Sequence, residues 1–274
     1  MKQILERLGQ LPVLPMVVQE VIRSLADPDA DAVALGHQIG QDPVLGARLL
    51  RVANSAFYGL SRQVATPHDA IMVMGLSQVR SLVLASGLAH ALPQHKGGLD
   101  RRKHWQRSFR VATTAQALAR RLRRPADAAF TAGMLHNIGE LVLDVCLPEA
   151  YAAARQASSS RGIPLRQAEQ AALGFDHTEV GAEVARHWKL PDVIEHAIRH
   201  CHDPELAATA EVSAGVAVAC LLDDGLVAGA ASPLPELPAS LRAAIPLDDA
   251  ALQACIPDAE QAASAAALLL GDSE

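Results

Sequence analysis

Apolar residues recur at helical spacing along most of the chain, and this repeat constrains the fold more than any other feature. Within residues 15–26, apolar side chains fall at positions 17, 18, 21, 22 and 25, which places them on one face of a helix. No segment shows the apolar–polar alternation of a half-buried strand. The sequence therefore predicts an all-α protein.

Proline, glycine and capping residues divide this helical pattern. Asp42 followed by Pro43 is a typical helix start. Ser77 is the predicted N-cap of a later helix, and Gly59 and Pro67 mark a connecting loop before it. Further helices are predicted over 100–123, 126–146, 149–160, 165–173, 177–189, 191–201, 206–224 and 259–270, with a surface loop over 228–240.

A polar stretch divides the helices into two groups. Residues 93–100, PQHKGGLD, combine proline, two glycines and polar side chains, which is typical of a linker. We therefore predict two helical lobes that meet near this segment. No sequence period recurs along the chain, which argues against a solenoid.

Composition excludes several classes of protein. Aromatic residues make up only 3% of the 274 residues and the formal net charge is −6, so direct nucleic-acid binding is not expected. No uninterrupted apolar run approaches the ~20 residues that span a bilayer. The four cysteines are scattered without a CxxC pair, which indicates reduced, buried thiols. These features predict a cytoplasmic protein.

Two blocks of sequence resemble the HDOD family, the HD-related output domains of bacterial signalling. The first covers residues 11–60 and contains DPVLGARLLRVANSAFYGL, continued by AIMVMGLSQVRSLVLA at 70–85. The second contains RSFRVATTAQALA, AFTAGMLHNIGELVL and HTEVGAEVARHWKLPDVIEHAIRHCHDPE. The resemblance covers about 11–205. It implies an N-terminal lobe over 1–95, a degenerate HD-like helical bundle over 96–205, and C-terminal helices over 206–274 that pack on that bundle.

The same resemblance implies that the metal site of active HD enzymes is altered. In those enzymes histidines and aspartates surround one or more metals. Here Arg107 stands at the early histidine of an HSxRVA pattern, Asn137 replaces the aspartate of the His-Asp pair, and Cys201 replaces a later histidine. A guanidinium has no lone pair to donate, and an amide lacks the charge of a bridging carboxylate. We therefore predict no bound metal, no cofactor and no catalytic residue.

Other residues of the implied pocket remain. His136, His177 and His202 are retained, and Glu140 stands where the HD-GYP phosphodiesterases have lysine. Three imidazoles could still form a residual zinc site, although a hydrogen-bonded core histidine is the simpler interpretation of His136. The predicted vestigial pocket consists of Arg107, His136, Asn137, Glu140, His177, Cys201 and His202.

A basic segment offers a candidate partner surface. Residues 99–124 hold nine basic residues and one acidic residue, a local charge of +8, whereas the other 15 basic and 29 acidic residues carry −14. Such asymmetry is typical of a face that binds an acidic partner, unless these arginines pair with neighbouring acids, for example Arg107 with Glu140 or Asp144. The candidate surface consists of Arg101, Arg102, Lys103, Arg110, Arg120, Arg121, Arg123 and Arg124.

These features favour a non-catalytic signalling module that acts by protein–protein interaction. The partner would be another signalling or regulatory protein, and the resemblance implies a possible link to cyclic-dinucleotide pathways. Two alternatives stay open: a residual metal-dependent phosphohydrolase acting on a nucleotide or cyclic dinucleotide, and an anion or nucleotide sensor in which Arg107 takes the place of the metal charge. The neighbouring aromatic residues Phe57 and Tyr58 are expected to be a packing anchor between the lobes rather than an exposed hot spot.

Overall fold

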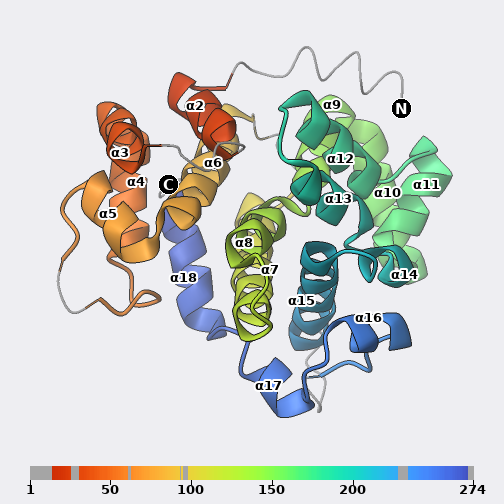
Figure 1. Ribbon diagram of the computed structural model, residues 1–274. Helices are drawn as coiled ribbons and strands as arrows, with labels where there is room; N and C mark the ends of the chain where they lie inside the picture. The colour runs from red at the N-terminus through yellow and green to blue at the C-terminus, as the bar shows by residue number, and fades with distance from the viewer. Residues whose placement is uncertain are drawn as a thin grey trace.

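The computed structural model describes residues 14–25, 31–60, 63–92, 94, 98–227 and 234–270. Throughout these ranges the chain forms helices joined by turns and loops and contains no strand, which confirms the all-α prediction. The helices gather into two groups that meet near the centre of Figure 1. None of the described helices combines the length and apolarity needed to cross a bilayer.

The first group is built from helices with one buried face. The predicted stripe on the first of them is confirmed, because Val17, Val18, Val21 and Ile22 are all buried. Asp42 begins a later helix as predicted, since its Oδ1 accepts hydrogen bonds from the Val44 and Leu45 amides at 3.0 Å. The helices of this group are α2 (Met16–Leu25), α3 (Ala32–Gln41), α4 (Pro43–Ala53), α5 (Pro67–Met74) and α6 (Leu76–Ala91).

The loop marked by Gly59 and Pro67 is confirmed over the described residues 59–60 and 63–66. Pro67 ends it and begins α5, a helix that was not predicted, where Thr66 is the cap and proline fits the first helical position. The predicted cap of the next helix is wrong. Ser77 does not cap α6, because that helix already begins at Leu76. Gly75 precedes it with φ 89°, a left-handed backbone conformation that glycine adopts without strain. Helix α3 was not predicted.

The second group surrounds a long central helix. Helix α7 packs against α8 and α15, and α12 packs against both α9 and α13 (Figure 1). Its members are α7 (Arg101–Arg121), α8 (Ala126–Leu135), α9 (Ile138–Cys146), α10 (Pro148–Arg161), α11 (Leu165–Leu173), α12 (His177–His187), α13 (Asp192–His200), α14 (Pro204–Ala207) and α15 (Glu211–Val227).

Two long predicted helices are each divided in the structure. The helix predicted over 126–146 is interrupted at Asn137, whose φ of −103° and ψ of 17° lie outside the helical region, so α8 and α9 are separate helices. The helix predicted over 206–224 is divided into α14 and α15. Tertiary packing rather than local propensity sets these breaks, because neither contains proline.

The C-terminal helices contact both groups. Of the loop predicted over 228–240, residues 228–233 lie outside the described residues, and the short helices α16 (Ala239–Ala244) and α17 (Asp249–Gln253) follow. Helix α18 (Ala259–Leu270) matches the predicted last helix and packs against α7, α4 and α6 (Figure 1).

Side chains also join the two groups. Helix α6 packs on α8, and the Phe57 ring lies edge-on to Phe109 of α7 with centroids 4.9 Å apart. Tyr58 packs against Phe57 at 5.1 Å. The expectation that these two aromatics anchor the lobes to each other is confirmed. All four cysteines are buried free thiols, also as predicted.

Candidate functional site

A cavity of about 680 Å³ opens between α7, α9, α11 and α12. It brings together five of the seven residues predicted for the vestigial pocket. His136 and Cys201 do not line it and lie buried in the core. The lining residues are Arg107, Asn137, Glu140, Pro164, Leu165, Arg166, Gln167, His177, His202 and Asp224.

Arg107 is held in the cavity by two carboxylates of α15. Its Nη1 lies 2.5 Å from Asp224 Oδ1 and 3.3 Å from Asp223 Oδ2. Asp223 is itself buried and also accepts from Arg110 Nε at 2.5 Å. Burial alone would lower the pKa of Arg107, but the acidic groups around it outweigh burial and the pKa is raised, so the charge is permanent. The expected partners, Glu140 and Asp144, are therefore wrong.

Glu140 is an anion within the cavity wall. Its Oε2 lies 3.6 Å from His104 Nδ1. Burial would raise the pKa of Glu140, but His104 and the positive charges of His177 and Arg107 bring it down to about 2. Asp144 has different partners: it accepts a hydrogen bond from the Leu99 amide at 2.8 Å and lies 3.7 Å from Arg101.

His177 is positioned by a buried glutamate. It is the first residue of α12, whose N-terminus Asp176 caps. Glu169 Oε2 accepts from the His177 backbone amide at 2.9 Å and from Nδ1 at 2.7 Å. Burial lowers the pKa of His177, but the bond and charge of Glu169 outweigh it, so the net pKa is raised. The other ring nitrogen, Nε2, is buried without a partner among the described residues.

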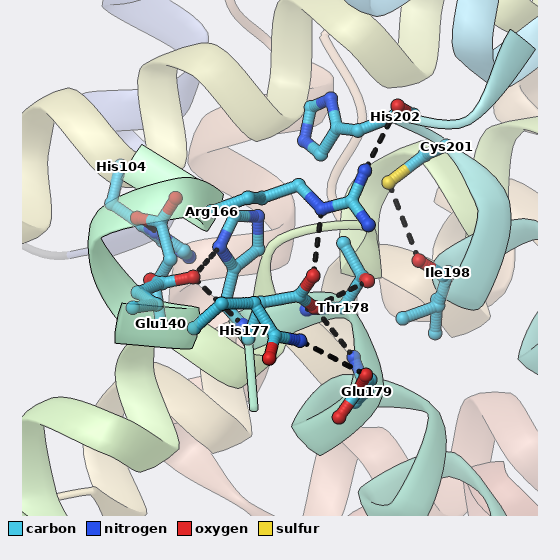
Figure 2. A network of polar contacts seen from close by, with 12 residues as sticks. His104, Glu140, Arg166, His177, Thr178, Glu179, Ile198, Cys201 and His202 are labelled. Atoms are coloured by element: carbon cyan, nitrogen blue, oxygen red, sulfur yellow. Dashed lines mark hydrogen bonds and ion pairs between the residues drawn. The ribbon is translucent and has the colours of Figure 1, made fainter. Parts of the chain in front are cut away.

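His202 lies beside His177 but in a different charge state. The two ring centroids are 5.4 Å apart. Burial, together with the positive charges of His177 and Arg107, lowers the pKa of His202 to about 3, so its ring is neutral. The backbone carbonyl of His202 accepts from Arg166 Nη1 at 2.9 Å, and Arg166 Nε donates to Asp176 at 2.8 Å (Figure 2).

The two predicted residues outside the cavity are core residues. His136 Nδ1 lies 2.7 Å from the Gly133 carbonyl, to which it donates, and the ring is fully buried. The Cys201 thiol donates to the Ile198 carbonyl at 3.3 Å (Figure 2). These contacts agree with the simpler interpretation of both residues, a core histidine and a buried thiol.

The predicted partner surface does not form one face. Arg102 and Lys103 are exposed at the start of α7, whereas Arg120, Arg121 and Arg123 are exposed at its end, about 30 Å away for a helix of 21 residues. Arg101 is buried near Asp144, and Arg110 binds Asp223. Arg124 donates to the Ala244 carbonyl at 2.8 Å.

A model of the HDOD domain matches residues 11–204. The chain belongs to the HDOD family. This assignment confirms the resemblance over about 11–205. Because the cavity holds five of the seven residues predicted for the vestigial pocket, we call it the HD-like pocket.

Solved structures from bacteria share this fold. The one named "Putative phosphohydrolase" from Shewanella amazonensis SB2B is 30% identical with a TM-score of 0.76, covering 97% of this chain and 98% of its own. The one named "Putative signal transduction protein" from Marinobacter aquaeolei VT8 is 29% identical with a TM-score of 0.70, covering 89% and 56%. These neighbours and the family support an HD-related regulatory module.

A curated relative extends well beyond the matched region. An uncharacterized protein of Treponema pallidum (strain Nichols) is 29% identical over 205 residues, which are 73% of this chain and 39% of the relative. The HDOD chain therefore spans about two fifths of the length of that relative.

The residues present do not fit the divalent metal that active HD enzymes hold. Within the described residues, no group of three or more His, Cys, Asp and Glu side chains is arranged to hold an ion. Arg107 brings a fixed positive charge, and Asn137 offers an uncharged amide where a carboxylate would be needed. Asn137 Oδ1 is buried without a partner among the described residues, so it remains available to a polar ligand.

Several residues of the site were missed by sequence reasoning. Asp223 and Asp224 follow the apolar run of α15, and this acidic pair at the end of a buried helix was the available signal. Glu169 and Arg166 act through contacts eight or more residues away, so no local spacing marked them. His104 precedes Arg107 by one helical turn, a spacing that places both on the same face of α7.

Proposed function

We propose that this HDOD protein is a non-catalytic regulatory module of cytoplasmic signalling that acts by binding another protein. The observation that carries the proposal is the pairing of Arg107 with Asp223 and Asp224 inside the HD-like pocket. A salt bridge there supplies charge balance without a metal. The intact helical scaffold around it supports a role in recognition rather than in hydrolysis.

The pocket is expected to be non-catalytic because it lacks a group that can activate water. Metal-dependent hydrolysis needs an ion that lowers the pKa of a bound water and neutralises phosphate oxygens. A guanidinium fixed by two carboxylates can do neither, because it has no lone pair and its charge is already compensated. Loss of single metal-site partners typically costs ~10–100-fold in affinity or activity, and this pocket differs at more than one position.

The first experiment measures metal and turnover together. The purified full chain is analysed for Fe, Mn and Zn and is assayed against a panel of phosphodiesters with each metal added. We expect less than stoichiometric metal and no turnover. The double variant Arg107→His/Asn137→Asp is the matched comparison, and we expect it to bind more metal than the natural chain.

The opposite result would restore the phosphohydrolase alternative. Stoichiometric metal in the natural chain, with turnover that His136→Ala or His177→Ala abolishes, would contradict a non-catalytic role. A fold check by circular dichroism on each variant separates loss of activity from loss of structure.

The partner-binding half of the proposal has its own test. The exposed cluster at the end of α7 consists of Arg120, Arg121 and Arg123, and its charge reversal to glutamate is compared with reversal of Arg102 and Lys103 at the other end. We expect a signalling partner captured from the native cell to be lost only on the first reversal. If the partner is still captured after both charge reversals, α7 is not the binding face.

A second candidate is an anion or nucleotide sensor in the same pocket. It is favoured by the volume of the cavity, by Arg107 and Arg166 in its wall, and by the unpartnered Asn137 Oδ1 and His177 Nε2. An anion would have to compete with Asp224 for Arg107. Thermal shift with nucleotides is the test, and a ligand-dependent rise that survives Arg107→Ala would count against this pocket.

A further inference from the structure

A second cleft lies in the seam between the two groups of helices, away from the HD-like pocket. Its volume is about 460 Å³. It shares no lining residue with the HD-like pocket. Its walls come from the loop after α4, from α5, α6 and α7, and from the segment before α18. The lining residues that matter below are Phe57, Tyr58, Gln78, Gln116, Arg120 and Ile256.

Two buried glutamines form the polar floor of this cleft. Gln78 of α6 and Gln116 of α7 are 7% and 4% exposed. Gln78 Nε2 donates to Gln116 Oε1 at 3.3 Å, and this is the one side-chain hydrogen bond that either amide makes within the described residues. The bond leaves a carbonyl oxygen on one amide and an NH₂ group on the other. The same pair of groups remains if both amides are turned over.

The carbonyl oxygen and the NH₂ group that remain form a recognition element for a polar ligand. Neither is among the buried atoms that lack a partner, so both are open to the cleft. A ligand edge that carries one donor and one acceptor can pair with both amides. Purine bases present such edges, and amide side chains pair with them in protein complexes.

The rest of the cleft suits a ring and an anion. Phe57 and Tyr58 supply aromatic surface, and Ile256 supplies apolar surface. Arg120 is an exposed cation on this cleft that forms no ion pair among the described residues. Asp258 is an acid that lines the same cleft, and its carboxylate accepts from the Gln261 amide at 2.8 Å as the cap of α18.

We propose that the seam cleft binds a purine nucleoside monophosphate, with the Gln78–Gln116 amide pair on the base edge, the aromatic pair Phe57–Tyr58 beside the ring and Arg120 on the phosphate. The ligand would touch both groups of helices and the segment that leads into α18. Its binding would therefore fix the relative positions of these elements. This site is independent of the proposed function of the HD-like pocket.

Isothermal titration of the full chain tests the proposal. The probes are GMP, AMP, guanosine and inorganic phosphate. We expect one-to-one binding of at least one of the two nucleotides, weaker binding of guanosine and no measurable binding of phosphate. Gln116→Leu and Arg120→Ala should each weaken nucleotide binding about tenfold, the effect of losing one good hydrogen bond.

Controls assign any binding to its site. Arg102→Ala removes the same charge from the far end of α7 and should leave the affinity unchanged. Arg120 is exposed, so Arg120→Ala tests the proposal even if Gln116→Leu fails to fold. Absence of nucleotide binding at millimolar concentration would overturn the proposal, as would binding that both cleft variants retain. Loss on Arg107→Ala with retention in Arg120→Ala would move the ligand to the HD-like pocket and would overturn it as well.

Discussion

Two imidazole rings lie 5.4 Å apart in the HD-like pocket, and their surroundings drive protonation in opposite directions. His177 donates to a buried glutamate, so its charged form is favoured and its pKa is raised. His202 has no such acceptor among the described residues, and burial together with the positive charges of His177 and Arg107 lowers its pKa to about 3. The pocket therefore holds a protonated His177 beside a neutral His202.

A titration checks these two charge states. In an NMR titration from pH 8 to pH 4, the pKa of His177 should lie above the ordinary histidine value of 6.5. The ring of His202 should stay neutral throughout this range. The unfolded state binds more protons than folded His202 between pH 6.5 and about 3, so His202 lowers stability as the pH falls through that window. His177 has the opposite sign, and its contribution is lost as the pH rises through its raised pKa. Titration of both rings near pH 6.5 would contradict the assignment.

Removal of a buried hydroxyl tests the packing of the seam. The Tyr58 hydroxyl is buried and has no hydrogen-bond partner among the described residues. Tyr58→Phe should therefore leave the free energy of unfolding unchanged or raise it by about 1 kcal/mol, because no bond is lost and an unpaired group is removed. Urea denaturation measures the change. A loss of more than about 1 kcal/mol would show that the hydroxyl has a partner.

At the scale of elements, glycine sets how closely helices approach beneath the pocket. A Cβ on Gly139 of α9 would lie 1.9 Å from the His177 carbonyl oxygen, and one on Gly133 of α8 would lie 2.6 Å from Ala112 Cα. These contacts involve backbone atoms, which cannot move aside without shifting a helix. The position of His177 therefore depends on a residue that has no side chain.

A matched pair of glycine substitutions tests this contact. Gly139→Ala should destabilise the protein by about 3 kcal/mol or more, because the added methyl group overpacks α9 against α12. Gly215→Ala in α15 is the control, since its nearest atom lies 4.0 Å away, and it should be neutral or stabilising by about 0.5–1 kcal/mol. Chemical denaturation of both variants gives the comparison. If both substitutions change the free energy of unfolding equally, the close packing of α9 on α12 does not require glycine at position 139.

At the scale of the whole molecule, α18 holds the two groups of helices together. It packs against α7 on one side and against α4 and α6 on the other. Its contact face is made of small residues, since Ala262, Ala265 and Ala266 are fully buried. Together with the Phe57–Phe109 contact, this helix joins the lobes without a large aromatic core.

A buried charge in α18 should separate the lobes. Ala265→Glu places a carboxylate in the fully buried face and should destabilise the protein by roughly 3 kcal/mol or more, because an unpaired charge loses its hydration. Ser264→Glu on the exposed side is the control and should have little effect. Calorimetry should show two transitions for Ala265→Glu and one for the control. A single transition in both variants would show that other contacts are sufficient to couple the lobes.

Local sequence patterns were sufficient for the helical class and for most helix positions, and the family resemblance supplied five of the residues that line the pocket. The apolar stripe of α2, the Asp42 cap and the altered residues Arg107 and Asn137 depend only on neighbouring residues or on a family resemblance. Breaks without proline, such as that at Asn137, were not foreseen because packing imposes them.

The sequence by itself determined that this chain is helical and that its HD-like pocket carries a guanidinium and an amide at altered positions. Only the tertiary structure decided that Asp223 and Asp224 hold Arg107, and that the basic residues of α7 separate into two exposed ends. The physical reason is range: helix periodicity acts over a few residues, whereas Arg107 and Asp223 are 116 residues apart in sequence and meet only when α7 packs on α15.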